Sequence, residues 1–345
     1  MRPRNGLHLP YVIDSLPLFA RLYRNAFRSG SGNRRTGWQR SLCRLLYYLY
    51  GWCNPRPAYG QVTMNIRGRE TVIRFDAKNR QFSALYFDRY LEEGYEPEVT
   101  SAIRELVPRA GVFYDVGSNW GYYALLVAAD AAFQGRVHAF EPWPASYRDL
   151  TETVRQAGLE DVIRCHAYAL GDCVGTVTMR CGRHSGLARV VRTERGVPVG
   201  QQTQDALAFD PPDLIKLDAE GAELAILQGA VALLRRSHPI LVFEHAGDGS
   251  PAQAGEVLAF LEAQGYRLYV PLVEYAAADG RVASCASGAN APPPGFAPSR
   301  LELLPIAARQ RCVFPRYLNL LACHPQRAAG LESYLADRRH RPVAA

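Results

Sequence analysis

A glycine-containing motif, Asp-Val-Gly-Ser-Asn-Trp-Gly at residues 115–121, has the residue types and spacing of a ligand-binding turn. An apolar run precedes it and an apolar helical pattern follows it, so a strand turns into a helix at this point. Gly117 and Gly121 permit a tight turn that brings backbone N–H groups and a helix start to the end of the strand. Asp115 suits a cationic group, such as the ammonium of a bound amino acid.

Glu141 stands twenty residues after Gly121, at the end of the next apolar run. In nucleotide-binding α/β folds an acid at this point accepts hydrogen bonds from ribose hydroxyls. A dinucleotide would need a second glycine for its pyrophosphate where this chain has Asn119. S-adenosylmethionine has a ribose and an adenine but no phosphate. The sequence therefore predicts S-adenosylmethionine as the cofactor, with Asp115 and the N–H groups of the turn for its methionine part and Glu141 for its ribose.

A second group of charged residues follows an apolar run at 214–217. Charges so close to a buried strand are costly unless they are paired or functional. Asp218 is expected beside the ligand, at the carboxyl ends of the strands. Glu223 is open to either role, because it could simply cap the next helix. Glu244 and His245 follow the next apolar run, and His245 could equally be an ordinary surface residue.

These residues are positioned by an alternation of strands and helices that predicts a doubly wound α/β sheet. Strands are expected at 112–116, 137–140, 162–167, 176–180, 214–217, 240–243 and 267–270, and helices at 97–108, 122–132, 146–157, 222–235 and 252–264. A β-hairpin is expected at 61–76, around Gly68. Residues 285–300 are rich in proline and glycine and predict a loop, after which 312–314 could form the last strand.

Several linked motifs resemble the FkbM-type S-adenosylmethionine-dependent methyltransferases. They are Gly-Tyr-Glu-Pro at 94–97, the run at 113–123, Ala-Phe-Glu-Pro at 139–142, Ala-Leu-Gly-Asp at 169–172 with Gly175, Thr-Gln-Asp-Ala-Leu at 203–207, Ile-Lys-Leu-Asp-Ala-Glu-Gly-Ala-Glu at 215–223, and 239–244. The resemblance implies a class I methyltransferase (Rossmann-like) sheet of seven strands with the last antiparallel. It also implies O-methylation of a hydroxyl on a sugar, glycan or secondary metabolite. Carried over to this sequence, the family's cofactor-binding residues would be Asp115, Gly117, Asn119, Gly121 and Glu141, with Asp172 near the adenine. Ser118 and Trp120 depart from the family pattern.

Methyl transfer to an alcohol is helped by removal of the hydroxyl proton. Asp218, Glu244 and His245 are the candidate catalytic residues, and they could instead bind Mg²⁺. Two other functions are open: a non-catalytic glycan- or membrane-surface-binding protein on a methyltransferase fold, and an NAD(P)-dependent oxidoreductase. We expect a small-molecule or glycan acceptor and no nucleic-acid partner.

The N-terminal 60 residues are strongly basic, with ten arginines, one acidic residue and no lysine. Residues 16–28 predict an amphipathic helix, and a second helix would carry a stripe of Trp38, Leu42, Leu45, Leu49 and Trp52. The helices could contact an anionic membrane surface through residues 16–52, or pack against the main domain. We expect packing, with both stripes covered.

The chain divides by pattern into a basic helical extension at 1–60, a hairpin and connecting segment at 61–96, a methyltransferase domain at 97–320 and a tail at 321–345. No apolar run is long enough for a membrane span, and the N-terminus does not fit a signal peptide. Eight sparse cysteines without ligand spacing argue against a zinc site and a disulfide scaffold. We therefore expect a cytoplasmic protein, either free or peripheral at the inner membrane face.

Overall fold

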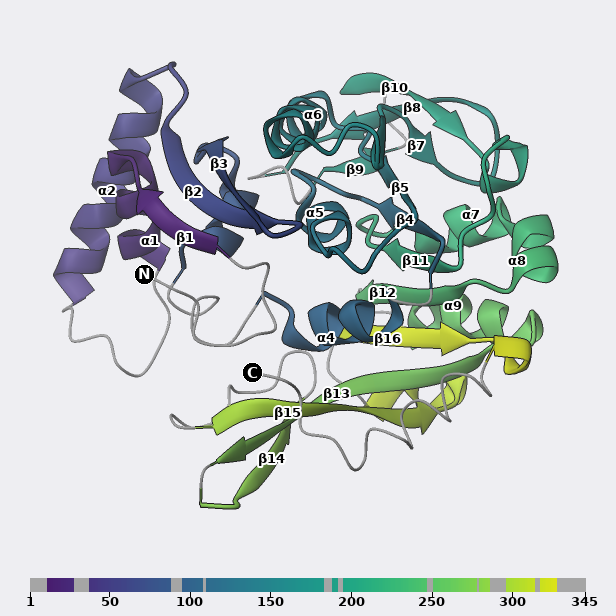
Figure 1. Cartoon of the computed structure of the whole chain (residues 1–345). Coiled ribbons are helices and arrows are strands. Elements are labelled where there is room, and N and C mark those ends of the chain that lie inside the picture. The colour runs from purple at the N-terminus through teal and green to yellow at the C-terminus, as the bar shows by residue number, and fades with distance from the viewer. Residues whose placement is uncertain are drawn as a thin grey trace.

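A computed structural model describes residues 11–27, 37–87, 95–107, 110–182, 188–191, 195–246, 251–277, 279–285, 296–313 and 317–327. Its centre is a large sheet with helices on both faces, and a smaller sheet with two helices lies on the N-terminal side (Figure 1). The predicted α/β class is confirmed.

The strands of the central sheet are β4 (Val112–Val116), β5 (Arg136–Phe140), β6 (Ile163–His166), β11 (Leu214–Leu217), β12 (Ile240–Ala246), β13 (Arg267–Ala277), β14 (Val282–Cys285), β15 (Phe296–Ile306) and β16 (Tyr317–Cys323). Their order is β14-β13-β16-β12-β11-β4-β5-β6, with β15 also paired to β13. The strands from β12 to β6 are parallel, and β16 is antiparallel to both of its neighbours. The sheet therefore has nine strands in the described residues, where seven were expected, because β14 and β15 extend it along the long β13.

Two layers of helices cover the sheet. They are α4 (Pro97–Leu106), α5 (Tyr122–Ala128), α6 (Pro144–Ala157), α7 (Glu223–Gln228), α8 (Val231–Ser237) and α9 (Pro251–Ala263). Alternate residues of β12 face the two layers: Val242 belongs to the core on the α4–α5 side, and Leu241 and Phe243 to the core on the α7–α9 side. The helix expected at 222–235 is interrupted at Gly229, so α7 and α8 are separate.

Three parts of the predicted element map were wrong. A second sheet, β7-β10-β8-β9, follows the central strands, although only one short strand was expected there. Its members are β7 (Ala169–Leu170), β8 (Gly175–Arg180), β9 (Arg189–Val191) and β10 (Val197–Gln202). The loop expected at 285–300 gives way to β15 from Phe296 onward. The last strand is not at 312–314: residues 312 and 313 end a 3₁₀ turn, η5 (Ala308–Val313), and residue 314 lies outside the described residues. The last described strand is β16, which extends past residue 320.

The N-terminal part consists of β1 (Tyr11–Ser15), α1 (Leu18–Phe27), α2 (Gly37–Cys53), β2 (Tyr59–Ile66), β3 (Arg69–Asp76) and the 3₁₀ turn η1 (Arg80–Leu85). A further 3₁₀ turn, η4 (Gln204–Ala206), precedes β11. The predicted hairpin is β2–β3, and β1 joins it as an unpredicted third strand. Val62 and Ile73 of this sheet share one core with Leu125 of α5, so the small sheet packs on the main unit.

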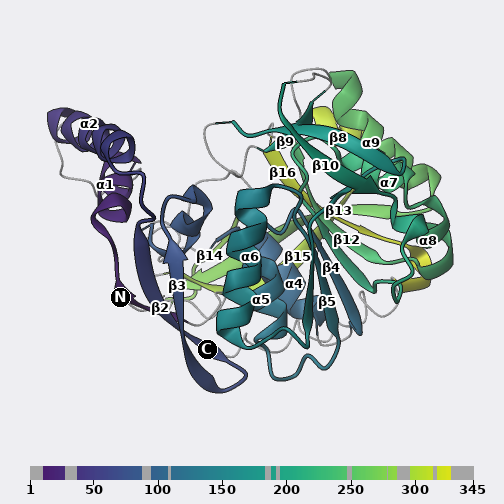
Figure 2. The ribbon, with the colours of Figure 1, turned by 90° about the horizontal axis from the view of Figure 1, so that it is seen from above.

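The stripe on α2 does not pack as expected. Trp38, Leu42, Leu45, Leu49 and Trp52 are all exposed, and α2 meets α1 through the opposite side, where Tyr47 is buried. Figure 2 shows α2 at the outer edge of the molecule, far from the central sheet. None of the described helices is both long enough and apolar enough to cross a membrane.

Candidate functional site

The turn after β4 crosses the turn after β11 at very short range. A Cβ on Gly117 would lie 1.8 Å from the carbonyl oxygen of Asp218, and the φ of Gly117 is +79°. Any side chain would therefore both clash and strain the backbone. The N–H of Gly117 donates to the carbonyl of Phe140 at the end of β5 (3.0 Å). The ends of β4, β5 and β11 are thereby tied together at one edge of the sheet.

Glu141 is held at this edge by two backbone donors. Its Oε2 accepts the N–H of Asn119 and its Oε1 accepts the N–H of Trp143, each at 2.8 Å. Asn119 has a left-handed backbone (φ 50°), and its side chain accepts a bond from Asn79. Burial raises the pKa of Glu141 to about 7, although both N–H bonds oppose that shift.

A cavity opens above these turns, and its wall changes character across the sheet. On the side of β5, β6 and β7 it is lined by Phe140, Pro142, Tyr168, Ala169, Leu170, Met179, Ala188 and Val190. Gly117, Ser118, Asn119 and Glu141 line the middle. On the side of β11 it is lined by Tyr95, Tyr122, Tyr123, Lys216, Asp218 and Glu220, together with the apolar residues Ala219, Ala222 and Ile226. The cavity thus joins an apolar slot, a carboxylate and a charged end.

The charged end is organised around Lys216, which is buried in β11. Its Nζ lies 3.0 Å from Oδ2 of Asp218 and 5.0 Å from the ring centre of Tyr123. The strand register sets Lys216 beside Asp115 of β4. Burial lowers the pKa of Lys216, but Asp218, Asp115 and Glu96 outweigh it, so the pKa is raised and the ammonium stays charged.

Glu96 belongs to this end and was not predicted as a site residue. Its Oε2 accepts the hydroxyl of Tyr123 at 2.6 Å. It precedes Pro97, the first residue of α4, and has a left-handed backbone (φ 44°). Burial raises the pKa of Glu96 to about 7, against the attraction of Lys216. In the sequence, Glu96 is distinguished only by its place in the motif at 94–97, directly before a proline that starts a helix. That position indicates a turn and does not indicate that Glu96 joins a cluster of charges.

Asp115 lies fully buried beneath the glycine turn and does not itself line the cavity. Its Oδ2 accepts the N–H of Ala124 at 3.0 Å, while Oδ1 has no hydrogen-bond partner among the described residues. Burial raises its pKa to about 6, although Lys216 lowers it. The structure therefore does not place Asp115 where the ammonium of a bound amino acid would reach it, although the sequence predicts this contact.

Glu244 and His245 are separated, because β12 continues to Ala246 instead of ending at residue 243. Successive strand residues point to opposite faces. Glu244 faces the carboxylates: burial raises its pKa to about 8, and Asp218 and Glu96 add to the shift. His245 is buried and follows Leu241 and Phe243 toward the α7–α9 core. The structure therefore does not bring His245 to the site.

Two further predicted cofactor residues are not at the cavity wall. Asp172 is exposed and lies outside the lining, so its expected place near the adenine is not supported. Gly121 starts α5 with φ +94°, and a Cβ there would lie 2.7 Å from Leu150. Its role is therefore to let the turn pack against α6.

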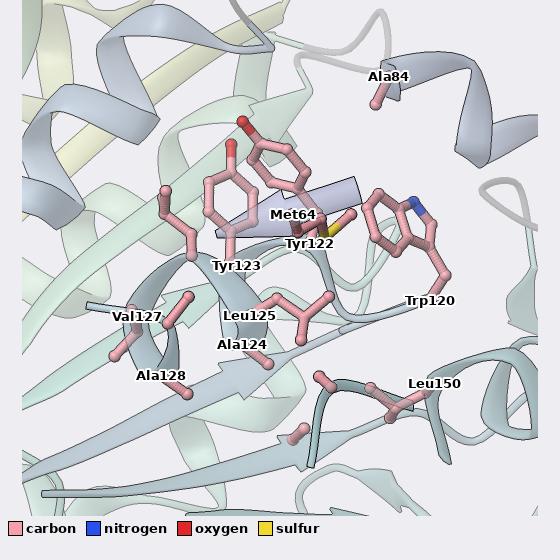
Figure 3. Packing of buried hydrophobic residues seen from close by; sticks show 14 of the residues in the cluster. Met64, Ala84, Trp120, Tyr122, Tyr123, Ala124, Leu125, Val127, Ala128 and Leu150 are labelled. Atoms are coloured by element: carbon pink, nitrogen blue, oxygen red, sulfur yellow. The ribbon is translucent and has the colours of Figure 1, made fainter. Parts of the chain in front are cut away.

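Trp120 both packs and lines the cavity. It is 2% exposed, and its ring lies 4.7 Å from that of Phe82 and 5.8 Å from that of Tyr122. Figure 3 shows the rings of Trp120, Tyr122 and Tyr123 on one side of the turn and of the first turn of α5, with Leu150 on the other. These rings join the small N-terminal sheet to the site wall.

The sheet order and the cavity at the carboxyl ends of β4 and β5 define a class I methyltransferase fold. Residues 115–268 match the family model described as Methyltransferase FkbM domain. Over these residues the chain is similar to the FkbM methyltransferase domain family.

Hexuronic acid methyltransferase AglP of Haloferax volcanii is 29% identical over 163 residues, which are 44% of this chain and 63% of that protein. The chain thus spans less than two thirds of this curated relative. Among solved structures, methyltransferase FkbM from Methylobacillus flagellatus is 18% identical, with a TM-score of 0.36 over 46% of this chain and 39% of that one. A putative O-methyltransferase from Klebsiella pneumoniae is 11% identical, with a TM-score of 0.38 over 72% and 96%.

Proposed function

We propose that this protein is an S-adenosylmethionine-dependent methyltransferase that methylates a hydroxyl oxygen of a sugar, glycan or secondary metabolite. The family of residues 115–268 supports methyl transfer, and the name of the haloarchaeal relative supports a sugar acceptor. The observation that carries the proposal is the three-part cavity wall, because each part matches one part of the cofactor.

The apolar slot beside β5 to β7 suits a purine ring, and Glu141 at its edge suits ribose hydroxyls. The carboxylates beside Lys216 at the other end of the cavity suit the cationic sulfonium and the ammonium of the methionine part. When bound, S-adenosylmethionine supplies an activated methyl group. The protein then has to align the acceptor and take up its proton.

Asp218 is the residue we propose as the base. Its side chain lines the cavity and is 25% exposed, whereas Glu244 and Glu96 lie behind the wall. Lys216 holds the carboxylate in place from the strand below. Tyr95 and Tyr123 line the same end and are suited to orient a hydroxylated acceptor.

The residues do not fit a Mg²⁺ site. Asp218 already has a cationic partner in Lys216, and His245 faces the other side of the sheet. No group of three or more His, Cys, Asp or Glu suited to a metal occurs among the described residues. We expect full activity after exhaustive chelation with EDTA.

Glu141→Gln tests the cofactor assignment. The change removes the charge that would accept ribose hydrogen bonds, which are worth about 1.5–3 kcal/mol each. We expect the affinity for S-adenosylmethionine and for S-adenosylhomocysteine to fall equally, by about tenfold or more, in calorimetry. Glu152→Gln, on the exposed face of α6, is the control. Unchanged affinity in a folded Glu141→Gln protein contradicts the assignment.

A second prediction concerns how the affinities for S-adenosylmethionine and S-adenosylhomocysteine differ in their dependence on pH. The raised pKa values of Glu96, Glu220 and Glu244, about 7, 7 and 8, mean that these carboxyls lose their protons as the pH rises from 6 to above 8. S-adenosylmethionine carries one more positive charge than S-adenosylhomocysteine. The affinity for S-adenosylmethionine should therefore rise more steeply with pH than the affinity for S-adenosylhomocysteine. Over this pH range, the ratio of the two affinities should increase by about tenfold. Parallel pH profiles in calorimetry would show that the carboxylates do not face the sulfonium.

A further inference from the structure

Helix α2 has two apolar faces, and only one is covered. On the inner face Tyr47 is 3% exposed, and its ring lies 4.7 Å from that of Phe19 and 5.2 Å from that of Tyr23, both on α1. Phe19 and Ala20 are themselves part of the main core. The helix is therefore anchored, and its outer face has a defined orientation.

The outer face is a continuous apolar stripe. Its residues recur every three or four positions, and they are Trp38 (65% exposed), Leu42 (46%), Leu45 (54%), Leu49 (46%) and Trp52 (84%). Leu46 and Tyr48 are exposed beside it. Scattered exposed apolar residues are ordinary, but a contiguous line of large ones marks an interaction surface. Figures 1 and 2 both place α2 at the margin of the molecule, away from the catalytic sheet.

The segment of chain that carries the stripe is basic. No acidic residue occurs between Asp14 and Glu70, a stretch that contains ten arginines and begins and ends outside the two helices. Arg44 is exposed on α2, with its guanidinium 5.4 Å from the ring centre of Phe27. A tryptophan stands near each end of the stripe, and tryptophan favours the boundary between headgroups and acyl chains.

We propose that α2 binds the surface of a bilayer that contains anionic lipids. The stripe enters the headgroup–acyl boundary, with the helix lying in the plane of the membrane, and the arginines meet the lipid phosphates. A protein partner would have to combine an apolar groove with acidic margins, whereas an anionic bilayer presents both over its whole surface. The proposal does not depend on methyl transfer, because binding is measured without cofactor.

Sedimentation with vesicles tests it, using the full chain. We expect the protein to sediment with vesicles of phosphatidylcholine and phosphatidylglycerol, to bind pure phosphatidylcholine much more weakly, and to be released by salt. Leu45→Glu/Leu49→Glu should lower binding to the anionic vesicles by about tenfold or more. Val174→Glu/Val282→Glu, which adds the same charge at two exposed aliphatic positions outside α2, should bind as the unmodified chain does.

Tryptophan fluorescence gives a second readout. Trp38 and Trp52 should be quenched by brominated lipid in the anionic vesicles, whereas Trp120 is buried and should not be. Failure of the unmodified chain to bind anionic vesicles overturns the proposal. So does equal binding by the two double variants. A dimer that Leu45→Glu/Leu49→Glu dissociates, without vesicle binding, would instead identify the stripe as an interface between two copies.

Discussion

Asp218→Asn is expected to lower kcat on the order of 10²- to 10⁴-fold while it changes the affinity for S-adenosylmethionine by no more than about threefold. The substitution keeps the size of the side chain but removes the acceptor for the hydroxyl proton. Its place in the cavity wall, 3.0 Å from Lys216, makes Asp218 the best-positioned carboxylate for that role. Steady-state kinetics and calorimetry on the same protein preparation measure both effects.

Glu220→Gln is the matched control for this prediction. Glu220 lies in the same turn, lines the same cavity and also has a carboxyl group, whose pKa burial raises to about 7. If both variants lose activity equally, the loss comes from the reduced negative charge of the site and not from the loss of a specific proton acceptor. If Asp218→Asn mainly weakens cofactor binding, then Asp218 holds the cofactor and is not the base.

The centre of the site was predictable from the sequence because its signals are local. A strand, a glycine turn and a helix start are all encoded within residues 112–128, and Glu141 follows at the end of the next apolar run. Gly117 shows the limit of such reasoning. A side chain at this position is excluded by the backbone of Asp218, which is about a hundred residues away in the sequence. The sequence alone indicates only that a turn occurs here.

The errors arose where the outcome depends on pairing between distant segments. The proline- and glycine-rich run at 287–295 predicts a loop that extends to residue 300, but β15 begins at Phe296. It contains Pro298 and Pro305, and it pairs only with β13 among the described strands, an edge position that accepts proline. The extension of β12 to Ala246 is supported by pairing with β16. That pairing sends His245 to the opposite face from Glu244, which no periodicity in such a short run could show.

The second helix illustrates a different limit. Its sequence contains two apolar faces, one with Tyr47 and one with the Trp38–Trp52 stripe, and hydrophobic periodicity does not say which one packs. The structure assigns the inner face to Tyr47 because Phe19 and Tyr23 of α1 meet it. The basic charge of the segment was visible in the sequence, but its relation to an exposed surface was not.

Lys216→Met is expected to cost about 3–5 kcal/mol of unfolding free energy, because it leaves buried carboxylates without their cation. Lys216 is 5% exposed and acts on Asp218, Asp115 and Glu96 together. The chain's only other lysine, Lys78, donates to a backbone carbonyl instead, so Lys78→Met is the control and should cost much less. Denaturant unfolding measures the difference.

The unfolding free energy that Lys216→Met removes should depend on pH. The buried carboxyl groups determine whether this loss grows or shrinks as the pH rises. Burial already raises the pKa of Glu96 to about 7 and of Asp115 to about 6, and removal of the ammonium raises both further. An acid whose pKa is higher in the folded state contributes stability below its unfolded pKa and loses it as the pH rises through the folded value. The variant should therefore be closest to the unmodified protein near pH 5 and fall furthest behind above pH 8. Adding Asp218→Asn should recover part of the loss, because one uncompensated charge is removed. A deficit that is equal at every pH, and unchanged by the second substitution, would mean that Lys216 contributes packing rather than charge.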